Sequence, residues 1–286
     1  MKKLIFFAMM LVFAWTSSLY AQDATTEEVS FGWQKELVGG INLSQTSFDN
    51  WSQGGENSFA WQMNLNGKFI NDQKNTNWSN MGKFTFGSTK TGDDESKKTI
   101  DEIKLESGLT YKLNFFVNPY IAGTAETQFA PGYHYGDGSD KIQMSDFMDP
   151  AYFRESVGVG YQPHDIIKTR LGAAMKQTLT TDFPVPFADD PGTSKTEKAK
   201  NEFGAESVTD MSWKLAENSI FDSKLELFST LSSIDEVDVN WDNILTTKLS
   251  KYLNVNFNFK LFYDRDISPK RQIKQAIAVG IMYSFL

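Results

Sequence analysis

The amino-acid sequence predicts an all-β fold, a transmembrane up-and-down antiparallel β-barrel of about twelve strands. Residues 253–264 alternate almost without error between apolar and polar side chains, and residues 275–285 repeat this pattern at the C-terminus. Side chains of a strand point alternately to opposite faces, so each of these strands has one apolar and one polar surface. Because an export signal stands at the other end of the chain, we expect the apolar surface to face lipid.

The N-terminus has the features of a cleaved signal peptide. Two lysines precede an apolar stretch at 4–15, and small residues lead to an expected cleavage after Ala21. The apolar stretch is shorter than the roughly 20 residues that a membrane-spanning helix requires. We therefore predict three parts, namely a signal peptide at 1–21, a periplasmic segment at 22–35 and an outer-membrane barrel at 36–286.

The remaining chain divides into alternating segments joined by turns. The predicted strands are 36–47, 57–70, 77–90, 99–113, 117–129, 151–162, 166–180, 203–216, 219–232, 237–250, 252–264 and 272–285. Connections alternate between long polar pieces, such as 130–150 and 182–201, and short turns, such as 72–75 and 162–165. Short periplasmic turns and longer external loops sort in this way in an outer-membrane barrel. The alternative, a secreted soluble β-protein, gives no reason for that sorting.

Composition excludes several classes of function. The formal net charge is −8 and the pI is near 4.9, whereas nucleic-acid binding requires clustered Lys and Arg. The chain has no cysteine, which removes disulfides, thiolate metal sites and thiol nucleophiles together. We expect no nucleic-acid partner.

A motif near the start of the barrel carries a family resemblance. After a Gln-Thr-Ser-Phe run the chain reads N-W-x-x-G-G-E-N, and the motif residues are Asn50, Trp51, Gly54, Gly55, Glu56 and Asn57. This resembles a signature of an uncharacterised outer-membrane family, a domain of unknown function, and residues 130–133 and the closing strand are also similar. The resemblance implies a barrel in a Gram-negative outer membrane and transfers no activity. Physically the motif suits an external turn, because glycine adopts positive φ and Trp lies well at headgroup level. The functional alternative is a Trp-capped site for an extracellular ligand.

Two histidines are the candidates for acid–base chemistry. His164 lies in a short turn, where exposure to solvent is expected. His134 lies in a long loop with Asp137, Ser139 and Asp140, which could hold a hydrolytic or metal cluster, but the spacing enforces no triad and no calcium loop. We therefore expect no enzymatic activity, no metal and no cofactor, and keep a barrel-embedded hydrolase around His134 as the weakest alternative.

Charged side chains fall on the predicted inner face of three strands. They are Lys168, Arg170, Lys176, Asp222, Lys224, Glu226, Asp238 and Asp242. Buried charges must be paired or wetted. Opposite charges could therefore lock the interior as a salt-bridge network, or they could line a water-filled constriction that selects solutes. The sequence does not decide between these two interpretations.

The number of strands does not determine whether the lumen is filled or forms a channel. About eight strands give an interior that side chains fill, and about sixteen leave a channel. Inward small residues such as Gly158 and Gly172 indicate either open volume or close packing of strands. The leading hypothesis is a porin-like barrel, a narrow pore or binding barrel for small polar or charged solutes. The alternative is a non-conducting structural or interaction barrel that acts through external loops 130–150 and 182–202. Expected partners are outer-membrane lipid and lipopolysaccharide, and the barrel-assembly machinery during biogenesis.

Overall fold

The computed structural model of the protein describes residues 31–50, 52–113, 115–136, 141–231 and 236–286. The predicted signal peptide, residues 22–30 of the predicted periplasmic segment and Trp51 lie outside these residues. The barrel strands are β1 (Gly32–Thr46), β2 (Ser58–Asp72), β3 (Thr76–Thr91), β4 (Lys97–Tyr111), β5 (Val117–Thr127), β8 (Ala151–His164), β9 (Ile167–Leu179), β10 (Ala199–Ala216), β11 (Ser219–Thr230), β12 (Val237–Lys248), β13 (Leu253–Tyr263) and β14 (Gln272–Ser284).

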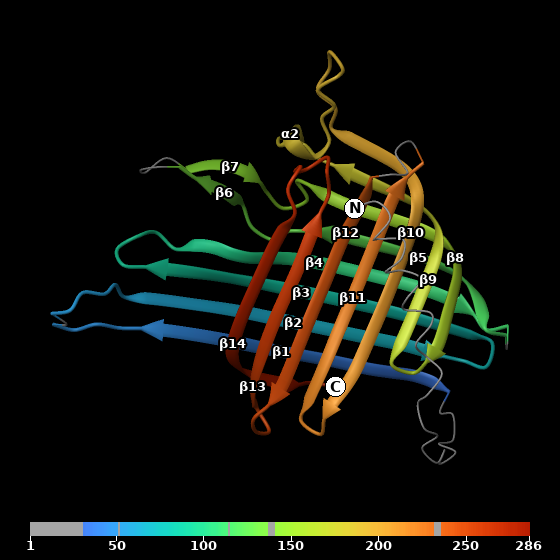
Figure 1. The fold of residues 1–286 in the computed structure, drawn as a ribbon, viewed down its shortest axis with the longest axis horizontal. Coiled ribbons are helices and arrows are strands. Elements are labelled where there is room, and N and C mark those ends of the chain that lie inside the picture. Colours follow the sequence, from blue (N-terminus) through green and yellow to red (C-terminus); the bar gives the residue numbers. More distant parts are fainter. Residues whose placement is uncertain (1–30, 51, 114, 137–140, 232–235) are drawn as a thin grey trace, which may run out of the picture. The chain divides into compact units, whose positions relative to one another are not determined.

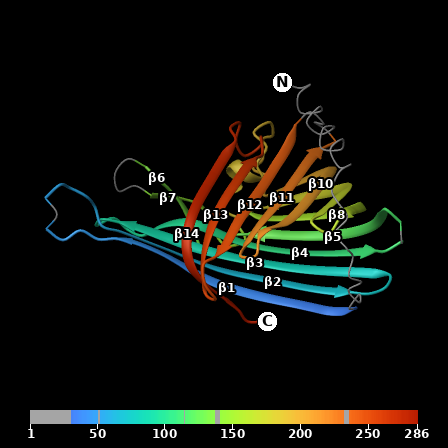
Figure 2. The same ribbon diagram turned by 60° about the horizontal axis from the view of Figure 1, so that its bottom comes forward.

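Within the described residues these twelve strands close into one antiparallel barrel (Figure 1). Strands adjacent in this series are neighbours in the wall, and β14 pairs with β1 to complete the circuit. The ribbons of β1–β5 run across the view and those of β11–β14 run steeply, so the two walls cross at a large angle (Figures 1 and 2). Among the described residues, no helix has the length and apolar character needed to cross a bilayer.

The strand boundaries agree with the predicted ones to within two residues, except at the starts of β1 and β10, and one connection contains an unexpected hairpin. β10 begins at Ala199 and not at residue 203. β1 begins at Gly32, so residues 32–35 belong to the barrel wall and not to the predicted periplasmic segment. The long connection between β5 and β8 contains a further hairpin of β6 (Gly132–Tyr135) and β7 (Lys141–Ser145), which was expected to be loop. A helical turn, α2 (Pro184–Phe187), lies in the connection between β9 and β10.

The barrel buries polar side chains and exposes apolar ones, which is the reverse of a soluble protein. Glu206 and Glu226 are buried, whereas Ile277 and Leu171 are 75% and 59% exposed. On β13 the alternation divides in the same way, with Asn254 buried inside and Leu253 and Phe257 on the outer face. An exterior of this kind requires hydrocarbon around it. The predicted fold class, an all-β transmembrane up-and-down barrel of about twelve strands, is confirmed.

The two ends of the barrel differ. At the short-turn end the strands are joined by brief connections such as 165–166 and 217–218. Here Trp33 packs on Trp78 with ring centroids 5.9 Å apart, and Tyr252 stacks on Tyr283 at 6.4 Å. Trp and Tyr prefer the membrane–water interface, so these rings indicate where that interface lies. At the opposite loop end the connections are long, as the sequence predicts.

Carboxylates fasten the connections at the loop end. Buried Asp149 accepts hydrogen bonds from the backbone N–H groups of Thr181 (2.9 Å) and Asp182 (2.7 Å), which holds the connection between β9 and β10. Asp101 of β4 accepts the N–H groups of Phe129 (2.7 Å) and Ala130 (2.9 Å) in the same manner. Hydrogen bonds to a charged acceptor are stronger than neutral ones, so these long connections lie on the barrel rim in defined positions.

Candidate functional site: a charged network across the lumen

One stretch of β4 places three charged side chains side by side in the lumen. Alternate residues of a strand share a face, so Glu102, Lys104 and Glu106 point inward while Leu105, between them, is exposed on the outer wall. The strand forms because this alternation suits a wall with water on one side and lipid on the other. Three adjacent inward charges need partners, and the opposite wall supplies them.

Lys104 and Glu106 reach strands that are not their neighbours. Lys104 Nζ lies 2.9 Å from Glu226 Oε1 on β11. Glu106 accepts Lys224 Nζ of β11 at 2.5 Å and Arg170 Nη1 of β9 at 2.8 Å. In the wall, β4 and β11 are separated by β5, β8, β9 and β10 on the shorter side. These ion pairs therefore cross the lumen.

A second set of pairs lies closer to the seam of the barrel, and it joins the neighbouring strands β3 and β4 to β12 and β13 on the opposite wall. Lys83 of β3 binds Glu102 at 2.8 Å and Asp242 of β12 at 3.3 Å. Lys260 of β13 lies 3.6 Å from Glu102. The charged side chains of both sets form what we call the central network, namely Lys83, Glu102, Lys104, Glu106, Arg170, Lys224, Glu226, Asp242 and Lys260.

Several charged side chains of the central network are largely buried. The side chains of Glu226, Glu106 and Lys104 are 6%, 7% and 15% exposed, so little water reaches them. Charges with so little hydration are stable only when paired and hydrogen-bonded. Asn240 completes the shell of Glu226 by donating to Oε2 at 2.8 Å. The network therefore joins opposite walls of the barrel through paired and largely buried charges.

A second charged cluster lies nearer the loop end. Lys176 of β9 is shared by Asp264 (2.7 Å), Asp238 (2.8 Å) and Glu202 (3.6 Å). Phe228, the next inward position after Glu226 towards the loop end, is 1% exposed. The Lys176 ammonium lies 5.7 Å from its ring centroid, a cation–π distance. This cluster and the ring of Phe228 lie between the central network and the loop-end opening.

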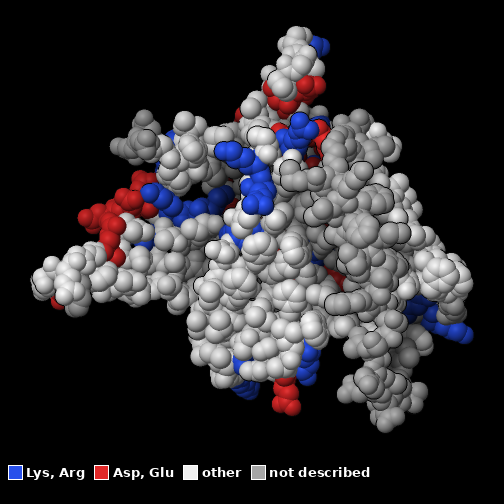
Figure 3. All heavy atoms as spheres, viewed as in Figure 1, with Lys and Arg blue, Asp and Glu red and all other residues white. Residues whose placement is uncertain are grey.

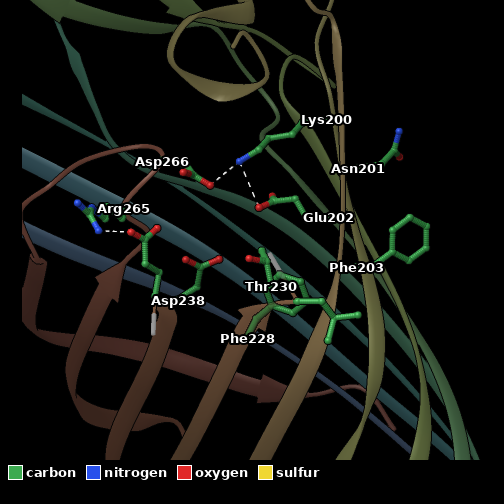
Figure 4. A pocket seen from close by; sticks show the side chains of 11 residues that line it. Lys200, Asn201, Glu202, Phe203, Phe228, Thr230, Asp238, Arg265 and Asp266 are labelled. Carbon is green, nitrogen blue, oxygen red and sulfur yellow. Dashed lines mark hydrogen bonds and ion pairs between the residues drawn. The ribbon is translucent and has the colours of Figure 1, made fainter. Parts of the chain in front are cut away.

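A cavity of about 490 Å³ opens above this cluster, and we call it the loop-end vestibule. Figure 4 shows Lys200 placed between Glu202 and Asp266, with Asn201 and Phe203 pointing to the other side of β10. Burial acts to raise the pKa of Asp266, but the hydrogen bond and charge of Lys200 outweigh it and hold that pKa below its usual value. Arg265 pairs with Glu236 at the rim. The vestibule thus offers both cations and carboxylates to an entering solute.

The predicted inward residues divide into two groups. Arg170, Lys176, Lys224, Glu226, Asp238 and Asp242 all take part in the ion pairs described above. Asp222 is instead exposed near the short-turn end and accepts the hydroxyl of Ser212 at 2.6 Å. Lys168 is exposed as well, and no described carboxylate lies within ion-pair distance of it.

Three residues that complete the network were not among the residues predicted to line the lumen. Glu102, Lys104 and Glu106 stand on the polar face of a clearly alternating segment, so the signal was present. It was not distinguishable from the polar face of any other strand, because only the closed barrel shows which inner faces oppose each other.

The inward glycines pack strands closely and do not open the lumen. Gly158 pairs with Gly172 across β8 and β9. A Cβ on Gly172 would lie 2.5 Å from the hydroxyl of Tyr120, and one on Gly158 would lie 2.1 Å from the carbonyl oxygen of Leu171. Tyr120 is buried and donates to Glu206 at 3.2 Å. Of the two interpretations of these glycines, close packing is the one that the structure bears out.

The histidines lie apart from the lumen network. His164 is exposed at the end of β8, where its Nδ1 accepts the N–H of Ile166 at 3.5 Å. His134 is exposed on β6, where it lies opposite Ile142 of β7, and its side chain forms no hydrogen bond with another described residue. Asp137, Ser139 and Asp140 lie outside the described residues, so the hydrolase hypothesis stays a prediction. Within the described part of the chain no three His, Asp or Glu side chains are grouped to hold a metal ion.

The motif at 50–57 forms the connection between β1 and β2. Asn50, Gly54 and Gly55 have positive φ values of 53°, 83° and 143°, as the turn interpretation predicts. Asn57 Oδ1 accepts the N–H of Phe48 at 2.7 Å and closes the turn. Glu56 lies against Gly92 of the neighbouring connection, where a Cβ would meet its carboxylate at 2.0 Å. The glycines of the motif therefore serve the backbone conformation of the turn. The Trp-capped ligand site stays a prediction.

Comparison with solved structures gives low-identity matches. The translocator domain of the autotransporter NalP from Neisseria meningitidis has a TM-score of 0.42 at 9% identity, covering 91% of this chain and 90% of that one. The NanC porin has a TM-score of 0.40 at 9% identity, covering 86% and 98%. An outer membrane channel from Pseudomonas putida has a TM-score of 0.40 at 10% identity, covering 93% and 99%.

Comparison by sequence gives two family matches, one in each part of the chain. Among proteins with curated functions, none matches. Residues 43–133 match the family described as "Protein of unknown function (DUF3078)", and this range includes the motif at 50–57. Residues 150–285 match the family described as "Protein of unknown function, DUF481". By sequence the chain is therefore similar to two families, both of unknown function, and each match covers less than half of it.

Proposed function

We propose that this protein is an integral outer-membrane barrel that binds small polar or charged solutes and passes them through a narrow, charge-lined lumen. The apolar exterior and the aromatic rings at the short-turn end support the membrane location. The observation that carries the proposed transport is the pairing of Lys and Glu side chains from opposite walls of the lumen.

The chemistry of such a passage follows from exchange of partners. A small anion entering from the loop-end vestibule competes with Glu226 for Lys104, and a small cation competes with Lys104 for Glu226. Each displaced group finds a second partner close by, because Lys104 also lies 3.6 Å from Glu126 and Glu226 lies 3.6 Å from Lys224. Conduction requires sites that bind enough to admit a solute and weakly enough to release it. Bulky solutes would have to break several pairs at once.

Conductance in planar bilayers tests the proposal. The purified barrel, checked for folding by heat-modifiable gel migration, should give small steps in potassium chloride and none when both ions are replaced by bulky organic ions. A heat-denatured sample is the matched control. A folded barrel that gives no steps in any salt overturns the transport proposal.

A second candidate is a non-conducting barrel that acts through its loop-end connections. It is favoured by the carboxylates of Asp101 and Asp149, which hold long connections in defined positions on the rim. Deleting residues 132–145 should then abolish the cellular phenotype while the barrel still migrates as a folded species. A phenotype that follows variants of the central network, and is indifferent to this deletion, excludes the second candidate.

A further inference from the structure

The seam that closes the barrel is paired along only part of its length. β1 pairs with β14 from Val38, opposite Ser284, to Asn42, opposite Gly280. Beyond Asn42, residues 43–46 of β1 pair with β2 alone, and residues 272–279 of β14 pair with β13 alone. Within the described residues, two strand edges therefore face the loop-end half of the seam without a partner.

This unpaired stretch lies at membrane depth. The aromatic rings of Tyr283 and Phe285 mark the short-turn end of β14, and a transmembrane strand takes about 9–11 residues to cross. The outward residues Ile273 and Ile277 face the lipid, and Ile277 is the most exposed large apolar residue that is described. Backbone groups without partners are costly in hydrocarbon. The free edge of β14 therefore requires water or a polar ligand beside it.

A cavity of about 370 Å³ lies behind the seam, and we call it the seam cavity. It is part of the lumen: β4 contributes residues 98–102 to its wall, and Lys83, Glu102, Asp242 and Lys260 of the central network also line it. Gln62 of β2 and Lys274 and Ala276 of β14 line it at the seam, whereas no residue of β1, which stands between those strands in the wall, does so. On β14 the inward residues Lys274 and Ala276 are exposed, whereas Gly280 in the paired part of the strand is buried. In the space-filling view, basic side chains and acidic ones lie side by side at the left, close to the strands that run across the view (Figure 3).

The charges around the seam cavity leave one cation without a carboxylate. Asp101 binds Lys98 at 2.9 Å, while Glu102 and Asp242 share Lys83. Lys274 has no described carboxylate within ion-pair distance, and its ammonium donates to the carbonyl oxygen of Thr99 on β4 at 3.1 Å. An anionic group in the cavity would pair with this ammonium without displacing an existing ion pair.

From these observations we infer that the gap between β1 and β14 is a lateral portal for an amphiphile with an anionic head and an apolar chain. The head lies in the seam cavity against Lys274 and accepts hydrogen bonds from the free N–H groups of β14. The apolar chain extends through the gap along Ile277 into the bilayer. This inference rests on the proposed membrane location, and it adds a ligand class and a lateral route that meets the lumen beside Glu102 and Asp242 of the central network.

Binding is measurable because the native chain offers no cysteine to compete for a label. The variant Ala276→Cys, labelled with an environment-sensitive dye and placed in phosphocholine nanodiscs, should shift its emission in a saturable way with dodecyl phosphate. Inorganic phosphate and dodecyl maltoside should cause no shift. Adding Lys274→Gln should weaken the apparent affinity about tenfold, or about 1.4 kcal/mol, whereas Lys248→Gln at the short-turn end should not. Equal affinity in both variants overturns the role of Lys274.

A second measurement locates the apolar chain. A fluorophore at Ile277→Cys should be quenched more by dodecyl phosphate bearing a spin label at its chain end than a fluorophore at Val157→Cys, which is also outward and exposed. Lys274→Gln should remove the difference, and equal quenching at both positions overturns the portal. Gel migration on the same samples records whether the barrel has folded and inserted, so failure of the membrane location is seen separately from failure of the portal.

Discussion

Removing the pair between Lys104 and Glu226 should open the lumen and reveal how strongly its walls are coupled. Breaking one side of a buried ion pair costs about 3–5 kcal/mol, because the remaining charge loses its partner. The loss of unfolding free energy for Lys104→Ala should lie at the low end of this range, since Glu226 keeps Lys224 and Asn240 as partners. Glu226→Ala should lie at the high end, since Lys104 keeps only Glu126 at 3.6 Å and the more distant charges. The double variant should cost less than the sum by roughly 0.5–3 kcal/mol, as coupled neighbours do.

Two assays measure these effects. Urea unfolding from lipid vesicles gives the free energies of the double-mutant cycle, and planar-bilayer recording gives the conductance, which should rise most in the double variant. The matched control is the exposed pair of Asp94 and Lys97, which has a similar N–O distance of 2.8 Å and should show no measurable coupling and no change in conductance. Additive free energies together with unchanged conductance would refute the assignment of this pair as a cross-lumen constriction.

Three further predictions concern packing, pH and the loop end. Gly172→Ala should lower the free energy of unfolding in urea by about 1–3 kcal/mol, because its Cβ would lie 2.5 Å from other atoms. Gly123→Ala, whose Cβ would have nothing within 4 Å, should leave this free energy unchanged. Equal losses in the two variants would contradict the close-packing argument. The pKa of Asp266 is lowered, so the stability from its pair with Lys200 is fully present above the usual pKa of a carboxyl group and is lost as the pH falls through the lowered pKa. Hydrogen exchange corrected for intrinsic rates should therefore show residues 264–271 opening below about pH 4. Unchanged protection of these residues at pH 3 would count against the stabilising role of this ion pair. Asp149→Asn removes a charged acceptor of two N–H groups. Proteolysis in the connection between β9 and β10 should therefore become faster, while the barrel keeps its heat-modifiable migration. An unaltered cleavage rate would show that the carboxylate does not hold this connection in place.

The wall of the barrel could be predicted from the sequence because the alternation within each strand identifies its apolar and polar faces. In residues 253–264 the alternation alone assigns Phe257 to the lipid and Asn254 to the lumen, and both assignments hold in the structure. Lipid outside and polar groups inside act on every residue separately, so local pattern is sufficient. The hairpin of β6 and β7 was missed because it does not cross the membrane, and its alternation is too short to stand out.

The interior could be predicted only in part, for a physical reason. That Glu226 and Arg170 point inward follows from alternation, but their partners depend on which strands oppose each other after closure. Lys104 lies 122 residues from Glu226 in the chain, and no local pattern connects them. The same limit hid the unpaired seam, because the alternation of β14 is the same in residues 272–279, which lack β1 as a neighbour, as in residues 280–284, which have it.

The long reach of the central network has a consequence for biogenesis. Glu102, Lys104 and Glu106 are made early, whereas their partners on β11–β13 emerge near the end of synthesis. Without those strands, Glu102 keeps Lys83, Lys104 keeps Glu126 and Glu106 keeps Arg170, but each loses the partner that it has on β11–β13. In a truncated chain ending before β11, transfer of these charges into a dry interior is therefore less favourable than in the closed barrel. We expect the middle of the barrel to lose its water only once β11–β13 are in place.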